Sequence, residues 1–259
     1  MRLRSLLYVP AHNEKFVAKA HERGADAIIL DLEDGVPADQ RAVARAALAT
    51  AVPAVRQNGA KAFVRINRGD EDDMIAAAAA GADAVLLPKV EFLPQIDFVA
   101  ERGLKVIAVI ESTGSVLDAR IIAQQLSVIG VCVGSEDLAL DLDATPTPEV
   151  LRTPKLLVHY AAKAAGKLSL GLLQSVADYA DLDKLRAAAR EARLHGFDGA
   201  TCVHPSAVAV LNEAFSPSDE ELDWARRVVA ADDGSGVFVV DGRMVDAPVI
   251  ARARRLLEE

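Results

Sequence analysis

The sequence is poor in the residues that build small cross-linked domains. Its 259 residues include only two cysteines, Cys132 and Cys202, which lie far apart and outside any CxxC pattern. This spacing argues against both a disulfide scaffold and a structural zinc site. We therefore expect both cysteines to be small buried residues within strands. Aromatic residues make up only 4% of the chain, which we interpret as packing rich in alanine helices.

Long apolar runs and long basic runs are also missing. No stretch approaches the roughly 18 apolar residues that cross a bilayer. The apolar run near the N-terminus is too short, and too soon followed by charge, to act as a signal peptide. Lys and Arg number 29 against 38 Asp and Glu, for a net charge of −9. We therefore expect a cytoplasmic protein that binds neither nucleic acid nor membrane.

What the sequence does contain is an alternation of short apolar runs with longer alanine-rich segments. The amphipathic segments 14–23, 38–51, 115–125 and 183–195 have the periodicity of helices. Apolar strands that are each followed by a helix predict a parallel sheet covered by helices. The eight predicted strands are residues 5–9, 27–32, 62–66, 84–87, 106–110, 128–133, 168–173 and 200–203.

Eight such units in one chain favour an α/β fold of the closed (β/α)₈ TIM barrel type over an open doubly wound sheet. An open sheet would be expected to carry a glycine-rich phosphate turn after its first strand. Here that turn reads Pro10-Ala11-His12-Asn13, with neither GxGxxG nor GxxxxGK[ST].

The last 45 residues break the alternation. Ser218 followed by Glu221 forms a capping box at the start of a helix, and a short strand at 237–240 and a final helix from about Pro248 come after it. We predict a barrel over residues 1–214 and a C-terminal helical and hairpin extension over 215–259. This extension is expected to act as a lid or as an arm that reaches a neighbouring subunit.

Charged side chains follow nearly every predicted strand, at the end of a barrel where catalytic groups lie. A ring of carboxylates repels itself unless a cation sits among them, and hard oxygen ligands favour Mg²⁺, with Mn²⁺ as a substitute. Glu111 and Asp137, from neighbouring strands, would suffice to hold it. The alternative is that these acids cap the helices that follow. The charged strand-end residues are Asp31, Glu33, Asp34, Arg65, Lys89, Glu91, Glu111, Glu136, Asp137 and His204.

Two of these residues have competing interpretations. Arg65 has a planar guanidinium that suits a carboxylate or an enolate oxygen, but it is also placed to pair with the acids after the second strand. His204 is a candidate base, although a His-Pro pair after a strand is also a common rigid turn.

The ordered motifs resemble the citrate lyase β-subunit family, part of the wider HpcH/HpaI aldolase group. The resemblance covers almost the whole chain. It rests on nine strings in the family's order, namely SLLYVPAHNEKFVAKA, GADAIILDLEDGVPADQRAVAR, FVRIN, LLPKVE, VIAVIEST, GSEDLALDL, GFDGATCVHPSAV, FSPSDEEL and DGRMVDAP.

The resemblance implies a (β/α)₈ barrel assembled as a homo-oligomer, typically a trimer. Glu111 and Asp137 would bind Mg²⁺, while Arg65 and Glu111 would contact the substrate. Asp246 would be a base lent to a neighbour's active site. The residues implied to line a site for coenzyme A or a phosphopantetheine thioester are Tyr8, Lys15, Lys19, Val203 and His204. For Lys15 and Lys19, one helical turn apart, a solvated helix face is the alternative.

The implied chemistry is a reversible Claisen-type cleavage of a citryl-, citramalyl- or malyl-type acyl thioester. Its products would be an acyl thioester and a keto-acid such as oxaloacetate, pyruvate or glyoxylate. Three alternatives stay open at this point: a lyase subunit that acts on a citryl-carrier protein within a citrate lyase complex, a Mg²⁺-dependent aldolase acting on free hydroxy-keto acids, and a non-catalytic barrel that binds a keto-acid or a protein partner.

Overall fold

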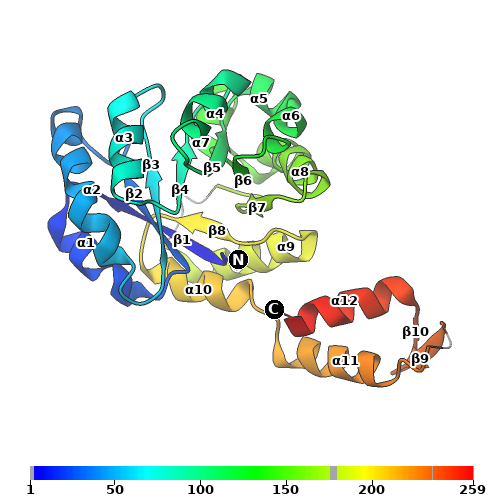
Figure 1. The fold of residues 1–259 in the computed structure, drawn as a ribbon. Helices are drawn as coiled ribbons and strands as arrows, with labels where there is room; N and C mark the ends of the chain where they lie inside the picture. The colour runs from blue at the N-terminus through cyan, green and yellow to red at the C-terminus, as the bar shows by residue number, and fades with distance from the viewer. Residues whose placement is uncertain (1–2, 176–179, 235, 259) are drawn as a thin grey trace.

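Eight parallel strands form a nearly closed barrel, as Figure 1 shows in a computed structural model that describes residues 3–175, 180–234 and 236–258. Each strand from β1 to β6 pairs with the next along the chain, and β1 also pairs with β8. The remaining seam, between β7 and β8, carries a single bridge from Leu170 to Gly199. The predicted barrel is therefore confirmed. The strands are β1 (Ser5–Pro10), β2 (Ala27–Asp31), β3 (Lys61–Arg65), β4 (Ala84–Leu87), β5 (Val106–Ile110), β6 (Val128–Val133), β7 (Leu168–Leu170) and β8 (Ala200–Cys202).

The seventh strand is shorter than predicted, because Gly171 adopts a φ of 137° that ends the extended ladder after Leu170. Gly199 allows the first and last strands to meet. A Cβ atom there would lie 1.8 Å from the carbonyl oxygen of Leu3, so only glycine fits this close approach.

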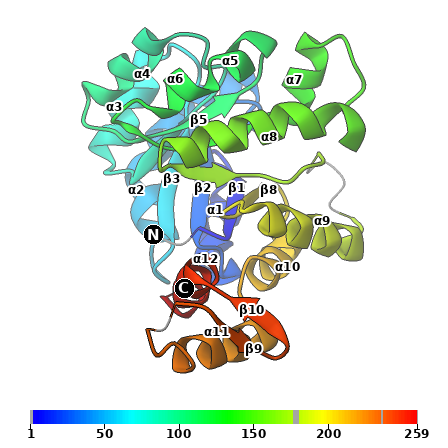
Figure 2. The same cartoon turned by 90° about the vertical axis from the view of Figure 1, so that its right-hand side faces the viewer.

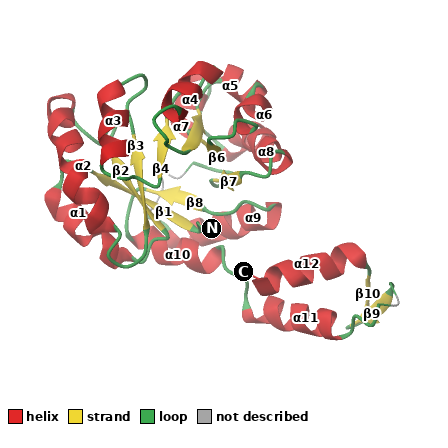
Figure 3. Ribbon diagram, viewed as in Figure 1, coloured by secondary structure: helices red, strands yellow, loops and turns green. Residues whose placement is uncertain are grey.

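Helices cover the outside of the barrel (Figures 1 and 3). The helix predicted over 115–125 is instead two short helices, because Asp118, with ψ near 3°, interrupts the α conformation. The barrel helices are α1 (Glu14–Ala20), α2 (Arg41–Val55), α3 (Glu71–Ala79), α4 (Leu93–Ala100), α5 (Thr113–Leu117), α6 (Ala119–Ala123), α7 (Ser135–Asp141), α8 (Pro148–Ala164), α9 (Leu182–His195) and α10 (Ser206–Ala214), with 3₁₀ turns η1 (His21–Arg23) and η2 (Ala38–Gln40).

Two layers of apolar side chains hold the barrel together. Leu6, Ile29, Phe63 and Ile107 pack inside the ring of strands, and a larger layer fills the space between strands and helices. Phe63 is completely buried, and burying a side chain of this size contributes about 1.5–3 kcal/mol. The interior is therefore a packed core that supports a site only at the ends of the strands.

The C-terminal extension lies beyond the barrel, as Figures 1 and 2 show from two sides. Helices α11 (Asp219–Ala230) and α12 (Ala247–Glu258) pack on each other and on the hairpin of β9 (Phe238–Val240) and β10 (Arg243–Val245). The predicted capping box is present, since the Ser218 side chain accepts a hydrogen bond from the Glu221 amide. The division of the chain into 1–214 and 215–259 stays a prediction.

Both cysteines are free and buried, as expected, in β6 and β8. Within the described ranges, no helix has the length and apolar character that a membrane crossing requires.

Candidate active site

A cavity of about 440 Å³ opens at the carboxyl ends of the barrel strands. Of the predicted site residues, Tyr8, Arg65, Glu111, Asp137 and Val203 all line it. They come from β1, β3, β5, the start of α7 and the end of β8, so the barrel brings together residues that are up to 195 positions apart (8 to 203). Their placement agrees with the rule that barrel enzymes carry their chemistry at this end. Their roles stay predictions.

Arg65 is held firmly by an acid on the neighbouring strand. Its Nε and Nη2 donate to the two carboxylate oxygens of Asp31, each at 2.7 Å, and its Nη1 lies 3.0 Å from Glu33. Burial alone would lower the pKa of Arg65, but the bonds and charge of Asp31 raise it above its ordinary value. The ion pair considered from the sequence is thus present, and it fixes the guanidinium in a bidentate geometry.

The guanidinium of Arg65 also lies 4.8 Å from the centre of the Tyr8 ring, within cation–π range. Burial raises the pKa of the Tyr8 hydroxyl well above its usual value, so the ring stays neutral. Tyr8 therefore forms an uncharged wall of the cavity beside a permanent positive charge.

Glu111 is the most perturbed carboxyl group of the cavity. Only 8% of the residue is exposed, and this burial, together with the charges of Asp137 and Glu33, raises its pKa to about 7. A 2.7 Å hydrogen bond from the backbone N–H of Lys89 opposes the shift. Gly134 makes room for the side chain, since a Cβ there would lie 2.3 Å from Glu111 Oε1.

Lys89 supplies a second positive charge next to these acids. Its Nζ lies 3.4 Å from Glu33 and 4.0 Å from Asp137. Burial alone would lower its pKa, but the charges of Glu33 and Asp137 raise it. Its backbone is left-handed, with φ of 51°, a conformation that costs a non-glycine residue roughly 1–2 kcal/mol. Strain of this kind is typical of functional sites.

Glu111 and Asp137 suit a magnesium ion. Magnesium is usually held by one or two carboxylates and keeps several waters. Burial, and after it the charges of Asp137 and Glu33, raise the Glu111 pKa, and a bound cation would relieve that crowding of negative charge. Among the described residues, no three His, Cys, Asp or Glu side chains gather into an all-protein metal site.

The other four predicted residues do not line the cavity in this chain. Lys15 and Lys19 are exposed on α1, as the solvated-face alternative expects. His204 is exposed, and its Nδ1 lies 2.7 Å from the hydroxyl oxygen of Ser206 in the turn that begins α10. Asp246 follows β10 in the C-terminal extension and accepts a hydrogen bond from the Val249 amide at 3.3 Å.

Four further polar residues, which were not predicted from the sequence as site residues, line the same cavity. Lys155 and His159 reach it from α8, and Cys132 and Ser169 reach it from β6 and β7. The signal that could have identified Lys155 is its register. It lies four residues after Leu151 and three before Val158, on the buried stripe of an amphipathic helix.

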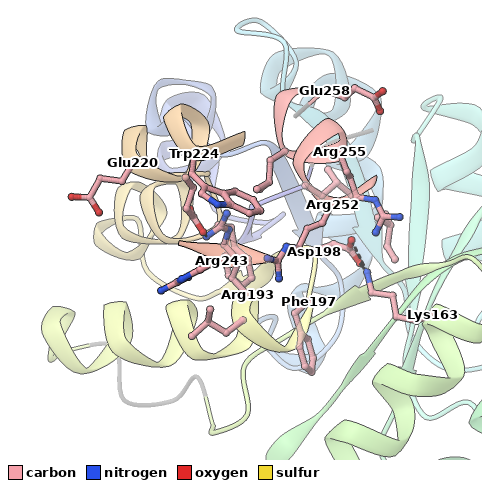
Figure 4. Close-up of a pocket in the computed structure, with 17 residues that line it drawn as sticks. Lys163, Arg193, Phe197, Asp198, Glu220, Trp224, Arg243, Arg252, Arg255 and Glu258 are labelled. Atoms are coloured by element: carbon pink, nitrogen blue, oxygen red, sulfur yellow. Dashed lines mark hydrogen bonds and ion pairs between the residues drawn. The ribbon is translucent and has the colours of Figure 1, made fainter. Parts of the chain in front are cut away.

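A second, larger groove of about 820 Å³ lies between the extension and the barrel (Figure 4). Its lining includes Leu3 and Leu168, at the amino ends of β1 and β7, together with Trp224, Arg243 and Arg252 of the extension. In barrel enzymes the catalytic residues lie at the opposite end, where the strands have their carboxyl ends. The smaller cavity is therefore the candidate active site.

Comparisons with known proteins agree with this geometry. The model of the HpcH/HpaI aldolase/citrate lyase family matches residues 4–205. A (3S)-malyl-CoA thioesterase of Cereibacter sphaeroides is 36% identical, with 98% of this chain and 93% of that protein aligned.

Two solved structures from Mycobacterium tuberculosis are also similar. The CitE protein in complex with magnesium, acetoacetate and coenzyme A superposes with a TM-score of 0.87 at 35% identity, covering 99% of this chain and 97% of that one. The citrate lyase β subunit complexed with oxaloacetate and magnesium gives 0.74 at 33% identity, covering 83% and 98%. The predicted resemblance and the prediction of a lyase-type enzyme are confirmed, and the chain belongs to the HpcH/HpaI aldolase/citrate lyase family.

Proposed function

We propose that the protein is a magnesium-dependent carbon–carbon lyase that cleaves, or in reverse forms, a 3-hydroxyacyl thioester of the citryl, citramalyl or malyl type. The observation that carries the proposal is the buried Glu111 carboxyl beside Asp137, facing the same cavity as the clamped Arg65. Relatives that bind magnesium with oxaloacetate, or with acetoacetate and coenzyme A, support the choice of ligands.

Glu111 and Asp137 would hold the ion, which when bound supplies positive charge to oxygens of the keto-acid and of the developing enolate. Arg65 would stabilise the same oxyanion with a charge that Asp31 keeps in place. Preorganised charge of this kind costs no rearrangement during the reaction. Tyr8 and Val203 would line the path of the thioester.

In the cleavage direction, a base takes the proton of the hydroxyl group. The C–O bond becomes a carbonyl as the C–C bond breaks, and the electron pair moves to the thioester enolate. The enolate carbon then takes up a proton, so the products are a keto-acid and an acyl thioester. We assign the base to Asp246, supplied by another copy of the chain, because within one chain it lies outside the cavity lining.

The surface of the extension supports this exchange. Val239 and Met244, on the hairpin next to Asp246, are each 69% exposed, and apolar side chains in such a position favour contact with another molecule. A homotrimer in the cytoplasm is part of the proposal. Lys15, Lys19 and His204 are proposed to contact the phosphates of coenzyme A or of a phosphopantetheine arm at the outer rim.

The test is an assay of the purified protein on citryl-, citramalyl- and malyl-CoA, with and without Mg²⁺. We expect keto-acid release that requires Mg²⁺ and that falls at least roughly 100-fold in Glu111→Gln or Asp246→Asn. Mixing these two variants should restore part of the activity, because a mixed oligomer contains some sites with both residues intact. Activity in Asp246→Asn equal to the wild type would refute the exchanged base.

Hydrolysis of the thioester is a second candidate, favoured by the (3S)-malyl-CoA thioesterase relative. With malyl-CoA, hydrolysis releases malate and free coenzyme A, while cleavage releases glyoxylate and acetyl-CoA. Chromatography of the products separates the two. Adding an acyl carrier protein substrate and free hydroxy-keto acids to the same panel tests the carrier-protein and aldolase alternatives.

A further inference from the structure

Lys155 is a buried positive charge in the wall of the candidate active site. Only 4% of the residue is exposed, although it lies on α8, a helix with one face toward solvent. Helix α8 packs behind β6 and β7. Lysine is almost never buried to this degree unless its ammonium group has a partner.

The partner that the chain provides is a neutral one. Nζ of Lys155 donates to the backbone carbonyl of Gln174 at 2.8 Å, in the loop after β7. No carboxylate of the described residues forms an ion pair with it, although the charge of Glu136 acts on it from farther away. An ammonium group has three N–H donors, so further donors remain for another acceptor. Arg65 differs, since its charge is met by Asp31.

The ammonium group lies at the same end of the barrel as the proposed metal ligands. The loop that receives its hydrogen bond follows β7, and Ser175 in this loop donates to Glu136, the residue before Asp137. Cys132 also lines the cavity, and its thiol is subject to the charges of Glu111, Arg65 and Lys155. Burial raises the pKa of that thiol to about 12, so it is uncharged and offers Lys155 no counter-ion.

We propose that Lys155 binds a second carboxylate of the substrate, which makes a dicarboxylic keto-acid the preferred product of cleavage. The inference rests on the proposed function. The first carboxylate and the keto oxygen of the keto-acid belong at Glu111, Asp137 and Arg65. A further carboxylate, one or two carbons away, then pairs with the buried ammonium group. Pyruvate and glyoxylate lack this group, whereas oxaloacetate carries it.

Burial of the charge makes the pairing selective. Desolvation lowers the pKa of Lys155 to about 8, so the group is mostly protonated at neutral pH. An anion that binds beside it replaces lost solvation, and a neutral group cannot do so. A substrate without the second carboxylate leaves the ammonium with the Gln174 carbonyl and the more distant charge of Glu136.

The test is isothermal titration of oxaloacetate, pyruvate and glyoxylate into the protein with Mg²⁺ present. The variant is Lys155→Met, and the control is Lys163→Met on the same helix. The ammonium group of Lys163 pairs with Asp198 on the far side of the barrel, in the groove beside the extension. In Lys155→Met we expect oxaloacetate affinity to fall roughly 10-fold to 100-fold, the range for a hydrogen bond to a charged group. Pyruvate affinity should change less than about 3-fold, and Lys163→Met should leave the preference unaltered.

Equal affinity of the wild type for oxaloacetate and pyruvate would overturn the proposal, as would equal losses for both in Lys155→Met. If Lys155→Met does not fold, as judged by circular dichroism, the pH dependence of the wild type decides. Oxaloacetate affinity should then weaken relative to pyruvate affinity above about pH 8, and a preference that is constant up to pH 9.5 would refute the assignment.

Keto-acid binding without turnover of any thioester would reject the lyase proposal and leave the proposed role of Lys155 intact. Absence of all keto-acid binding would reject both.

Discussion

The cavity at the strand ends and the groove beside the extension differ in how the protein holds their charged side chains. The cavity at the strand carboxyl ends is about 440 Å³, and its Asp31 and Glu111 are nearly buried and anchored on strands. The groove beside the extension is about 820 Å³, and its Arg243, Arg252 and Arg255 are exposed. The larger groove thus lies between the extension and the barrel. The smaller cavity is the one in which burial shifts the pKa of carboxyl groups. Burial of charge on a rigid frame identifies the active site better than volume does.

Substitution of Glu111 should give the largest difference in kcat between a change in the cavity and a change in the groove. We expect Glu111→Gln to lower kcat by about 10³-fold, since it removes one of two proposed metal ligands and a charge at the reacting centre. The matched control is Arg252→Gln in the groove, which should leave kcat within about 2-fold. Steady-state kinetics on the best CoA thioester measure both. A larger loss in Arg252→Gln than in Glu111→Gln would reverse the assignment of the cavity and the groove.

Gly134 offers a subtler change that leaves every charge in place. In Gly134→Ala the new Cβ would overlap Glu111 Oε1, which it would approach to 2.3 Å. The displaced carboxylate should lower kcat by about 10²-fold, the typical effect of a misplacement near 1 Å. Gly114→Ala is the control, because a Cβ there meets no atom within 4 Å. Thermal unfolding should show that both variants fold, and unchanged kcat in Gly134→Ala would mean that the precise position of Glu111 does not matter.

The smallest effect is a pH dependence of stability without metal. The folded-state pKa of Glu111, about 7, lies above its ordinary value of 4.5. The folded state therefore binds the proton more tightly, and stability from this group is complete below pH 4.5 and is lost as the pH rises to 7. The loss should be on the order of 2–3 kcal/mol in the free energy of unfolding.

Urea titrations at pH 4.5, 6 and 7.5 in the presence of a chelator measure this loss. It should be absent in Glu111→Gln. Saturating Mg²⁺ should reduce it in the wild type, because the ion binds the ionised form. An identical slope in the variant and the wild type would show that another group titrates.

Much of the barrel could be predicted from the sequence, because its strands are continuous apolar runs bounded by glycine turns. Three of the eight strand ranges, 84–87, 106–110 and 128–133, match the structure at both ends. The break at Asp118 was not predictable from periodicity, since the apolar pattern continues through it. The end of β7 was missed for a similar reason, because Leu172 and Leu173 stay buried after the ladder has ended.

The candidate site was predictable where its residues follow strands. Arg65, Glu111 and Asp137 were predicted because they follow strand ends. The acids after the second strand were also predicted as possible ion-pair partners of Arg65. Lys155 was missed because it comes from a helix behind the sheet, where the strand-end rule does not apply. Its spacing from Leu151 and Val158 indicates that Lys155 is buried, but the packing of α8 on β6 and β7 is what places the ammonium group at the cavity.

The seam between β7 and β8 has a consequence for the motions of the barrel. One bridge at Leu170 and two backbone hydrogen bonds, from Gly171 to the Gly199 carbonyl and from Asp198 to the Ser169 carbonyl, close the ring there, while every other pair of neighbouring strands has three or more paired positions. Backbone amides along this line should exchange with deuterium before those of β2 and β3. Because Ser169 and Leu170 also line the cavity, a ligand that joins the two sides of the site would slow that exchange and close the ring more tightly.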